Sequence, residues 1–217
     1  MKQPLLIACD FDGTVTKQDT LVEILDRYGS ASWRSVQDQV VAGTLSIREG
    51  LRQEMSSVRA DLHQLKNLLS ERVALDAGFP PFFSRMRNSG IPVVLLSGGF
   101  DLCVETVMQR HGLWPVPYLA NRLVRDNGSW RVEYPHPSAA CDNCGHCKAD
   151  AVKAWKEQGY FTVFVGNGVT DRCAAEVAGL TFAKDELAAW CATQKIPAVA
   201  YATFHDIEAD LNRRGWL

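Results

Sequence analysis

The sequence contains no apolar run long enough to cross a bilayer and no concentration of basic residues. Its 217 residues carry 23 lysines and arginines against 25 aspartates and glutamates, a formal net charge of −2. Because neither a spanning segment nor a basic surface is indicated, we expect no membrane partner and no nucleic-acid partner. The first residues also lack the charged and apolar regions of a signal peptide, so we expect a cytoplasmic protein.

Internal repeats, low-complexity tracts and a disulfide pattern are absent as well. The seven cysteines are an odd number, and most stand singly within apolar segments, as Cys9, Cys103 and Cys191 do. This usage favours reduced thiols in a reducing compartment. With 47% hydrophobic residues, the chain is long enough to bury one large α/β core with a small insertion. Nothing in the pattern indicates an oligomeric state.

Most of the chain alternates short apolar strands with amphipathic helices. Strands are predicted at residues 5–9, 91–96, 161–165 and 180–183, with a further short one at 198–201. Helices are predicted at residues 82–89, 101–111, 149–158, 172–178 and 207–213. This alternation is typical of a parallel sheet covered on both faces, so the predicted fold class is α/β with a three-layer, Rossmann-like core.

One block interrupts the alternation and is helical throughout. Apolar positions recur with helical spacing in residues 21–28, 33–41, 46–58 and 62–74. We therefore predict an inserted all-helical cap at residues 17–77 and a core domain made of residues 1–16 and 78–217. Within the core, the turn residues 126–128 (Asp-Asn-Gly) between alternating segments predict a small β-hairpin.

Three polar clusters follow predicted strands, at residues 10–14, 97–99 and 166–171. Since ligands of parallel sheets bind beyond the carboxyl ends of the strands, we expect these clusters to meet in one crevice. Asp10 and Asp12 start on the same side of their strand and repel each other. A divalent cation would relieve this repulsion, and oxygen ligands favour Mg²⁺.

Together these clusters resemble the haloacid dehalogenase superfamily, and specifically its phosphatases with a helical cap. Residues 10–14 (Asp-Phe-Asp-Gly-Thr) match the first family motif, and residues 97–99 (Ser-Gly-Gly) match the second. Lys148 opens a predicted helix and matches the third, and residues 166–171 (Gly-Asn-Gly-Val-Thr-Asp) nearly match the fourth. The resemblance covers almost the whole chain in the family's order, and four motifs together are highly specific.

This resemblance implies hydrolysis of a phosphomonoester in two steps. Asp10 would attack phosphorus and form an aspartyl-phosphate, while Asp12 would protonate the leaving oxygen and then activate water. Asp12 needs a raised pKa for this role, and we expect the neighbouring carboxylate to cause it. The implied phosphate-binding residues are Thr14, Ser97, Gly98 and Lys148. The implied Mg²⁺ ligands are Asp10, Asp12, Asn167 and Asp171.

Asn167 departs from the family pattern, which has a metal-binding aspartate at this position. An amide oxygen can coordinate Mg²⁺ but carries no charge. One unit charge at about 4 Å is worth up to ~4 kcal/mol at an effective dielectric of about 20, so we predict weak Mg²⁺ affinity. Asp171 would then carry more of the metal binding. The same departure supports an alternative hypothesis, a protein that binds a phosphorylated ligand without turning it over.

The cap should select the substrate, a small phosphorylated metabolite, because it closes over the leaving group. Segments 45–50, 97–101 and 144–148 resemble the family's methionine-salvage phosphatases, which act on 2-hydroxy-3-keto-5-methylthiopentenyl-1-phosphate. Phosphoserine phosphatases grip the amino acid with a cap glutamate and a cap arginine, and Asp19 and Glu54 stand at these positions. Losing the arginine argues against phosphoserine. Phosphoserine, although disfavoured by this change, stays an alternative substrate together with phosphocholine, phosphoethanolamine and pyridoxal phosphate. A mutase or phosphonate hydrolase is less favoured.

Cys141, Cys144 and Cys147 have a spacing that zinc sites use, and two histidines lie close by in the sequence. Zinc would require a fourth ligand, and the adjacent Lys148 has to point into the phosphate pocket. A loop of reduced cysteines is therefore favoured over a structural Zn²⁺ site at these three residues.

Overall fold

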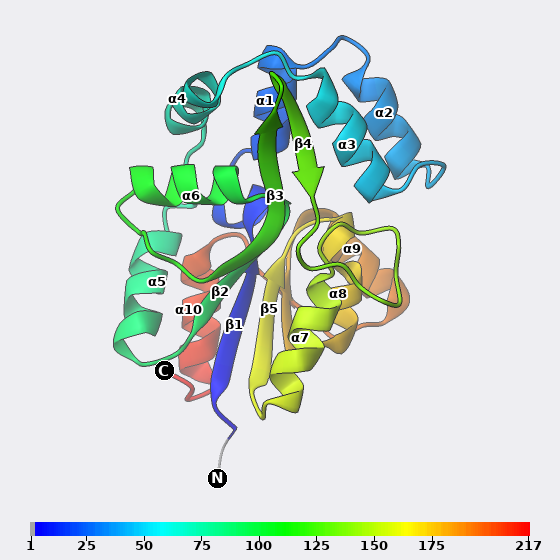
Figure 1. Cartoon of the computed structure of the whole chain (residues 1–217). Helices are drawn as coiled ribbons and strands as arrows, with labels where there is room; N and C mark the ends of the chain where they lie inside the picture. The colour runs from blue at the N-terminus through cyan, green and yellow to red at the C-terminus, as the bar shows by residue number, and fades with distance from the viewer. Residues whose placement is uncertain (1–2) are drawn as a thin grey trace.

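The strands of the protein form one sheet with β1 at its centre (Figure 1). The computed structural model describes residues 3–217, so the first two residues of the predicted core lie outside the described residues. Within this range the sheet has seven strands in the order β4-β3-β2-β1-β5-β6-β7, and the neighbouring pairs are parallel except β3 with β4. The strands are β1 (Leu5–Asp10), β2 (Val93–Phe100), β3 (Tyr118–Asp126), β4 (Ser129–Glu133), β5 (Phe161–Gly166), β6 (Leu180–Ala183) and β7 (Val199–Ala200).

Helices cover both faces of this sheet. The core helices are α5 (Phe79–Asn88), α6 (Asp101–Arg110), α7 (Lys148–Glu157), α8 (Arg172–Val177), α9 (Asp185–Gln194) and α10 (Phe204–Arg213). Along β1, Ile7 and Cys9 pack in the apolar cluster that contains residues of α5, α6 and α10, whereas Leu6 and Ala8 pack with residues of α7, α8 and α9. Successive side chains of a strand point to opposite faces, so this division confirms the three-layer α/β fold.

Four α-helices lie between β1 and α5 in the described chain and form the all-helical cap. They are α1 (Thr20–Tyr28), α2 (Trp33–Val41), α3 (Ile47–Ser57) and α4 (Leu62–Arg72). Figure 1 shows them in blue and cyan beyond the carboxyl end of β1. The two connections to the core run side by side, because Thr16 pairs with Leu75 and the Lys17 amide donates to the Ala74 carbonyl at 2.8 Å. The boundaries at residues 17 and 77 stay a prediction.

The hairpin forms where the turn residues predict it. β3 and β4 pair from Arg122 with Glu133 to Asp126 with Ser129. The two linking residues, Asn127 and Gly128, have φ values of 46° and 84°, which asparagine and glycine tolerate better than other residues. β3 also pairs with β2, so the hairpin extends the main sheet. In Figure 1 it reaches up to the cap helices.

Several predicted boundaries were wrong, for identifiable reasons. α5 begins at Phe79 because prolines are tolerated in the first turn of a helix, and the expectation had placed its start after them. α9 was not predicted at all. β2 continues to Phe100, which pairs with Asn121 of β3, so residues 97–99 lie inside the strand and not after it. None of the helices in residues 3–217 is long and apolar enough to cross a membrane.

Candidate active site

Asp10, Lys148 and Asp171 form a buried ionic cluster at the carboxyl end of β1. Asp10 is the last residue of β1, and Lys148 is the first residue of α7. The Lys148 ammonium donates to Asp10 and, at 2.7 Å, to Oδ1 of Asp171. Their side chains are 7%, 3% and 1% exposed for Asp10, Lys148 and Asp171 respectively, so the pairing takes place out of water. The first, third and fourth sequence motifs therefore meet, as predicted.

This burial changes the acidity of the cluster. Burial and the Asp171 carboxylate raise the pKa of Asp10 above its ordinary value, although Lys148 opposes them. Burial alone would lower the pKa of Lys148, but the carboxylates of Asp10 and Asp171 outweigh it and raise the pKa. Lys148 is therefore charged at neutral pH and compensates one of two facing carboxylates. The cluster keeps a net negative charge, which suits a cation.

Asp171 also shapes the loop that precedes it. Its Oδ2 accepts hydrogen bonds from the amides of Asn167 at 2.9 Å and Gly168 at 3.0 Å. A Cβ atom at Gly166 would lie 2.6 Å from this oxygen, so glycine is required there. One carboxylate oxygen of Asp171 therefore fixes the loop through charge-assisted hydrogen bonds from its backbone amides. The other oxygen accepts a hydrogen bond from Lys148.

Asn167 joins the fourth motif to the first. Its Oδ1 accepts a hydrogen bond from the Thr14 hydroxyl at 3.2 Å, and its Nδ2 lies against Gly13, which has a φ of 74°. Thr14 is fully buried, so its side chain ties the two loops together. The predicted phosphate-binding role of Thr14 stays a prediction.

Asp12 is positioned by a residue that the sequence reasoning missed. The amide and hydroxyl of Thr20, the first residue of α1, donate to Asp12 Oδ1 at 2.8 and 2.6 Å. Burial, followed by the Asp19 carboxylate, raises the pKa of Asp12 to about 7. The raised pKa was expected from a neighbouring carboxylate; carboxylates do contribute, but burial is the largest cause and Asp10 contributes least. The helix start at Asp19-Thr20 was the available signal for Thr20.

The second motif closes the site from the side of β2. Ser97 is fully buried, and its Oγ accepts a hydrogen bond from the Gly99 amide at 3.0 Å. A Cβ at Gly99 would lie 3.0 Å from Asp12 Oδ2, and one at Gly98 would lie 3.9 Å from the Thr170 hydroxyl. The three polar clusters therefore converge, and small residues at 98 and 99 allow the close approach.

The two predicted cap residues lie on neighbouring helices. Asp19 caps α1, since its side chain accepts a hydrogen bond from the Val22 amide at 3.0 Å. Glu54, in α3, is 2% exposed. Burial and the Asp19 carboxylate raise the pKa of Glu54 to about 7. Their predicted role in substrate selection stays a prediction, but the Asp19 carboxylate is close enough to raise the pKa of both Asp12 and Glu54.

The cysteine-rich loop lies between β4 and α7. Cys141, Cys144 and Cys147 are all free thiols, and Cys173 of α8 lies near them. Burial raises the pKa of Cys144 to about 12, with the neighbouring thiols adding to the effect. No three His, Cys, Asp or Glu residues in the range 3–217 are arranged to hold a metal ion. The structure therefore gives no support to the Zn²⁺ site.

The oxygen groups at the sheet edge nevertheless suit Mg²⁺. They comprise two buried carboxylates, Asp10 and Asp171, and the amide side chain of Asn167 in place of a third acid. Hard oxygen ligands are the donors that Mg²⁺ prefers, and it commonly keeps several waters when protein carboxylates bind it. The donor set therefore fits this ion without a third acidic side chain.

Comparison with known proteins agrees with this geometry. A family model described as haloacid dehalogenase-like hydrolase matches residues 7–176. The chain belongs to this family. Proteins named 2-hydroxy-3-keto-5-methylthiopentenyl-1-phosphate phosphatase are similar to it. The one from Bacillus pumilus (strain SAFR-032) is 30% identical over 98% of this chain and 93% of its own length. The one from Bacillus cereus (strain AH187) is 31% identical over 94% of each chain.

Solved structures support the fold. A phospho-aspartyl intermediate analogue of phosphoserine phosphatase has a TM-score of 0.72 and 22% identity, covering 98% of this chain and 99% of its own. A substrate-bound phosphoserine phosphatase complex has a TM-score of 0.73 and 22% identity, covering 96% and 99%. With the family match and the named relatives, the protein is a phosphatase of the haloacid dehalogenase family.

Proposed function

We propose that this protein is a Mg²⁺-dependent phosphomonoesterase that works through a phosphorylated Asp10. The observation that carries the proposal is the buried Lys148 ammonium, which joins Asp10 to Asp171 at the carboxyl edge of the sheet. Lys148 holds the carboxylate of Asp10, the proposed nucleophile, in place. Its positive charge is also available to the phosphoryl group during transfer.

In the first step, a carboxylate oxygen of Asp10 attacks phosphorus and the ester P–O bond breaks. Asp12 donates its proton to the leaving oxygen, which departs as an alcohol. In the second step, Asp12 takes a proton from water, whose oxygen attacks the phosphorus of the aspartyl-phosphate. The bond between Asp10 and phosphorus breaks, inorganic phosphate leaves and Asp10 is regenerated.

The environment of Asp12 suits both steps. A pKa of about 7, raised by burial and by Asp19, lets Asp12 give and take a proton near neutral pH. The hydrogen bonds from Thr20 hold one carboxylate oxygen, so the other, beside Gly99, is the one that faces the reacting group. Thr20 is therefore a positioning residue in this mechanism.

The remaining residues hold the phosphoryl group and the metal. Ser97, Gly98, Thr14 and Lys148 would bind the phosphoryl oxygens. Asp10, Asn167, Asp171 and the Asp12 backbone carbonyl would hold Mg²⁺, which neutralises negative charge on the phosphoryl group when it is bound. Because Asn167 would be an uncharged ligand, we expect the protein to bind Mg²⁺ weakly.

For the substrate we propose a small phosphorylated metabolite, with 2-hydroxy-3-keto-5-methylthiopentenyl-1-phosphate as the first candidate. Relatives bearing that name match almost the full chain at about 30% identity. Glu54 also stands where phosphoserine phosphatases carry the cap arginine, and no ion pair involves Asp19 or Glu54 among the described residues. This argues against phosphoserine as the substrate.

Replacing the nucleophile tests the mechanism. Wild-type protein, Asp10→Asn and the surface control Asp26→Asn are compared for hydrolysis of p-nitrophenyl phosphate and of the candidate substrate in Mg²⁺. We expect Asp10→Asn to lose at least about a thousandfold in kcat and Asp26→Asn to lose nothing. Acid quenching of the wild type should trap phosphate on the peptide that contains Asp10.

Two results would overturn the proposal. Hydrolysis that survives in Asp10→Asn would exclude Asp10 as the nucleophile. Tight binding of phosphate esters by the wild type without any turnover, even in excess Mg²⁺, would support the non-catalytic alternative that Asn167 suggests.

A further inference from the structure

Glu54 is a buried acid that the fold leaves unsatisfied. The residue is 2% exposed, and none of the groups in residues 3–217 donates a hydrogen bond to its Oε1. It also forms no ion pair within that part of the chain. A buried polar group without a partner is costly, so such a group indicates a missing ligand or a functional role.

The position of Glu54 points to the leaving-group side of the site. Asp12 is hydrogen-bonded to the first residue of α1, and the Asp19 carboxylate lies close enough to affect both Asp12 and Glu54. The three acids therefore run from the reacting centre outward to α3 of the cap. We expect the leaving group of a substrate whose phosphorus sits at Asp10 to extend in this direction, because Asp12, the acid proposed to protonate it, lies on this side.

The three acids cannot all be charged cheaply in a buried site without a base. Asp19 accepts a backbone hydrogen bond at the N-terminus of α1, and Asp12 accepts two from Thr20. The bond to Asp19 favours its anion, whereas the bonds to Asp12 hold only Oδ1 and leave Oδ2 free to carry the proton that the mechanism requires. Glu54 is buried and receives no such bond at Oε1, so its neutral form costs less than its anion.

We propose that Glu54 determines specificity by donating a hydrogen bond, as a neutral carboxylic acid, to a carbonyl oxygen of the substrate's leaving group. The inference rests on the proposed phosphatase function and names the class of substrate, a phosphomonoester of a hydroxyketone. The candidate substrate proposed above carries a keto group. A leaving group with a carboxylate is repelled by the acids around it, and one with an ammonium group would need Glu54 to be charged.

Replacing Glu54 by glutamine tests whether Glu54 acts as a neutral hydrogen-bond donor or as an anion. Glutamine keeps an N–H donor of nearly the same size but cannot become negative, whereas Glu54→Leu removes the donor. The substrates are hydroxyacetone phosphate, n-propyl phosphate, which lacks the carbonyl, and 2-aminoethyl phosphate, which carries a cation. The readout is the ratio of kcat/KM between them, with p-nitrophenyl phosphate as a reference and Glu49→Gln, at a half-exposed position of α3, as the matched control.

We expect the wild type to prefer hydroxyacetone phosphate to n-propyl phosphate by at least about tenfold in kcat/KM. Glu54→Gln and Glu49→Gln should keep that ratio, while Glu54→Leu should reduce it to near one. A circular dichroism spectrum equal to that of the wild type and an unchanged or higher thermal midpoint in Glu54→Leu would show that the variant is folded.

Two outcomes would overturn the inference alone. A wild-type preference for 2-aminoethyl phosphate that is lost in both Glu54 variants would show that Glu54 acts as an anion. A ratio that stays high in Glu54→Leu would show that Glu54 does not contact the leaving group. If the wild type hydrolyses none of these esters, p-nitrophenyl phosphate included, the proposed function fails and the inference falls with it.

Discussion

Asn167 lies where the fourth motif meets the first, with its Oδ1 bonded to Thr14 and its Nδ2 against Gly13. We predict that Asn167→Asp tightens Mg²⁺ binding at least about tenfold, because a unit charge near the metal is worth up to ~4 kcal/mol before compensation. An aspartate oxygen can still accept the Thr14 bond. The measurement is a Mg²⁺ titration of p-nitrophenyl phosphate hydrolysis together with calorimetric Mg²⁺ binding.

Asn88→Asp is the control for this prediction, because it adds the same charge at an exposed position at the end of α5. It should leave the half-saturating Mg²⁺ concentration unchanged. An Asn167→Asp protein that binds Mg²⁺ no more tightly than the wild type would contradict the metal assignment of this residue.

Glu54 should make the stability of the protein depend on pH. Its pKa is raised from 4.5 to about 7, so between these values the folded protein keeps a proton that the unfolded chain has released. The stability contributed by the neutral acid is therefore complete below about pH 4.5 and lost as the pH rises to about 7. Glu54→Gln cannot ionise and avoids this loss.

We predict that the free energy of unfolding of Glu54→Gln, minus that of the wild type, increases across this pH range by up to about 3 kcal/mol. Above about pH 7 this difference should be constant. Urea unfolding at several pH values measures the difference, and Glu49→Gln should show no such trend because Glu49 is half-exposed. A flat difference for Glu54→Gln would mean that the pKa of Glu54 is not raised.

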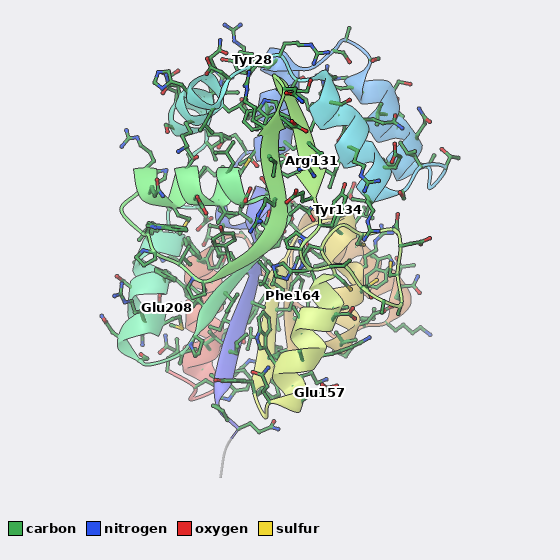
Figure 2. The ribbon with its side chains drawn as sticks, viewed as in Figure 1. Tyr28, Arg131, Tyr134, Glu157, Phe164 and Glu208 are labelled. Atoms are coloured by element: carbon green, nitrogen blue, oxygen red, sulfur yellow. The ribbon has the colours of Figure 1, made fainter. Side chains whose placement is uncertain are left out.

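At the scale of the helices and strands, the core segment between β4 and α7 contacts the cap at the start of α3. The Asn143 backbone carbonyl accepts from the Arg48 amide at 2.9 Å, and its side-chain Oδ1 accepts from the Ile47 amide at 3.1 Å. The Tyr134 hydroxyl donates to the Arg48 carbonyl, and Figure 2 shows Tyr134 below the hairpin and facing α3. The start of α3 is therefore held by the core.

We predict that Asn143→Ala speeds amide hydrogen exchange at Ile47 by about tenfold or more, because that amide loses its acceptor. The Arg48 amide, which is bonded to the backbone of Asn143, should change less. Asp142→Ala is the control, since Asp142 is an exposed neighbour in the same loop. Equal protection of Ile47 in both variants would show that the loop does not hold the cap through this side chain.

The elements differ in how far local sequence determines them. The turn at Asn127 and Gly128 has backbone angles that few residues accept, so the hairpin could be predicted from its own residues. α5 was predicted from local pattern but its first turn was not, because Phe79 packs on Phe204, which is far away in the chain. α9 has only a narrow buried side, with Leu187 and Cys191, so its helical period is weak.

The same contrast holds at the site. Asp10 and Asp171 could be predicted because their motifs follow strands whose carboxyl ends must meet, and Lys148 because it matches the third motif of the family. The burial of Glu54, its missing partner and its proximity to Asp19 depend on how α1 and α3 pack, which no local pattern specifies. The approach of Cys173 to the cysteine loop likewise depends on the packing of α7 against α8.

For the molecule as a whole, one apolar cluster extends from the sheet into the cap. It contains Ile7 of β1 and Val104 of α6 together with Ile24, Met55 and Leu65 of the cap helices. Helix α4 lies beside α6 of the core, and the hairpin residue Trp130 donates from its indole to the Ala60 carbonyl at 3.0 Å. Because the buried apolar residues of the cap belong to the same cluster as those of the sheet, the cap has no hydrophobic core of its own, and the two should unfold together.

A cavity in the cap tests this cooperativity. We predict that Leu65→Ala, at a fully buried position of α4, lowers the thermal midpoint by on the order of 10 °C, since such changes typically cost about 2–5 kcal/mol. Calorimetry should still show one transition, monitored equally by circular dichroism and tryptophan fluorescence. Leu62→Ala, at a site of the same helix that is 45% exposed, should change the midpoint little. A second, earlier transition in Leu65→Ala would show that the cap unfolds independently, and that its contacts with α6 and the hairpin are too weak to couple it to the sheet.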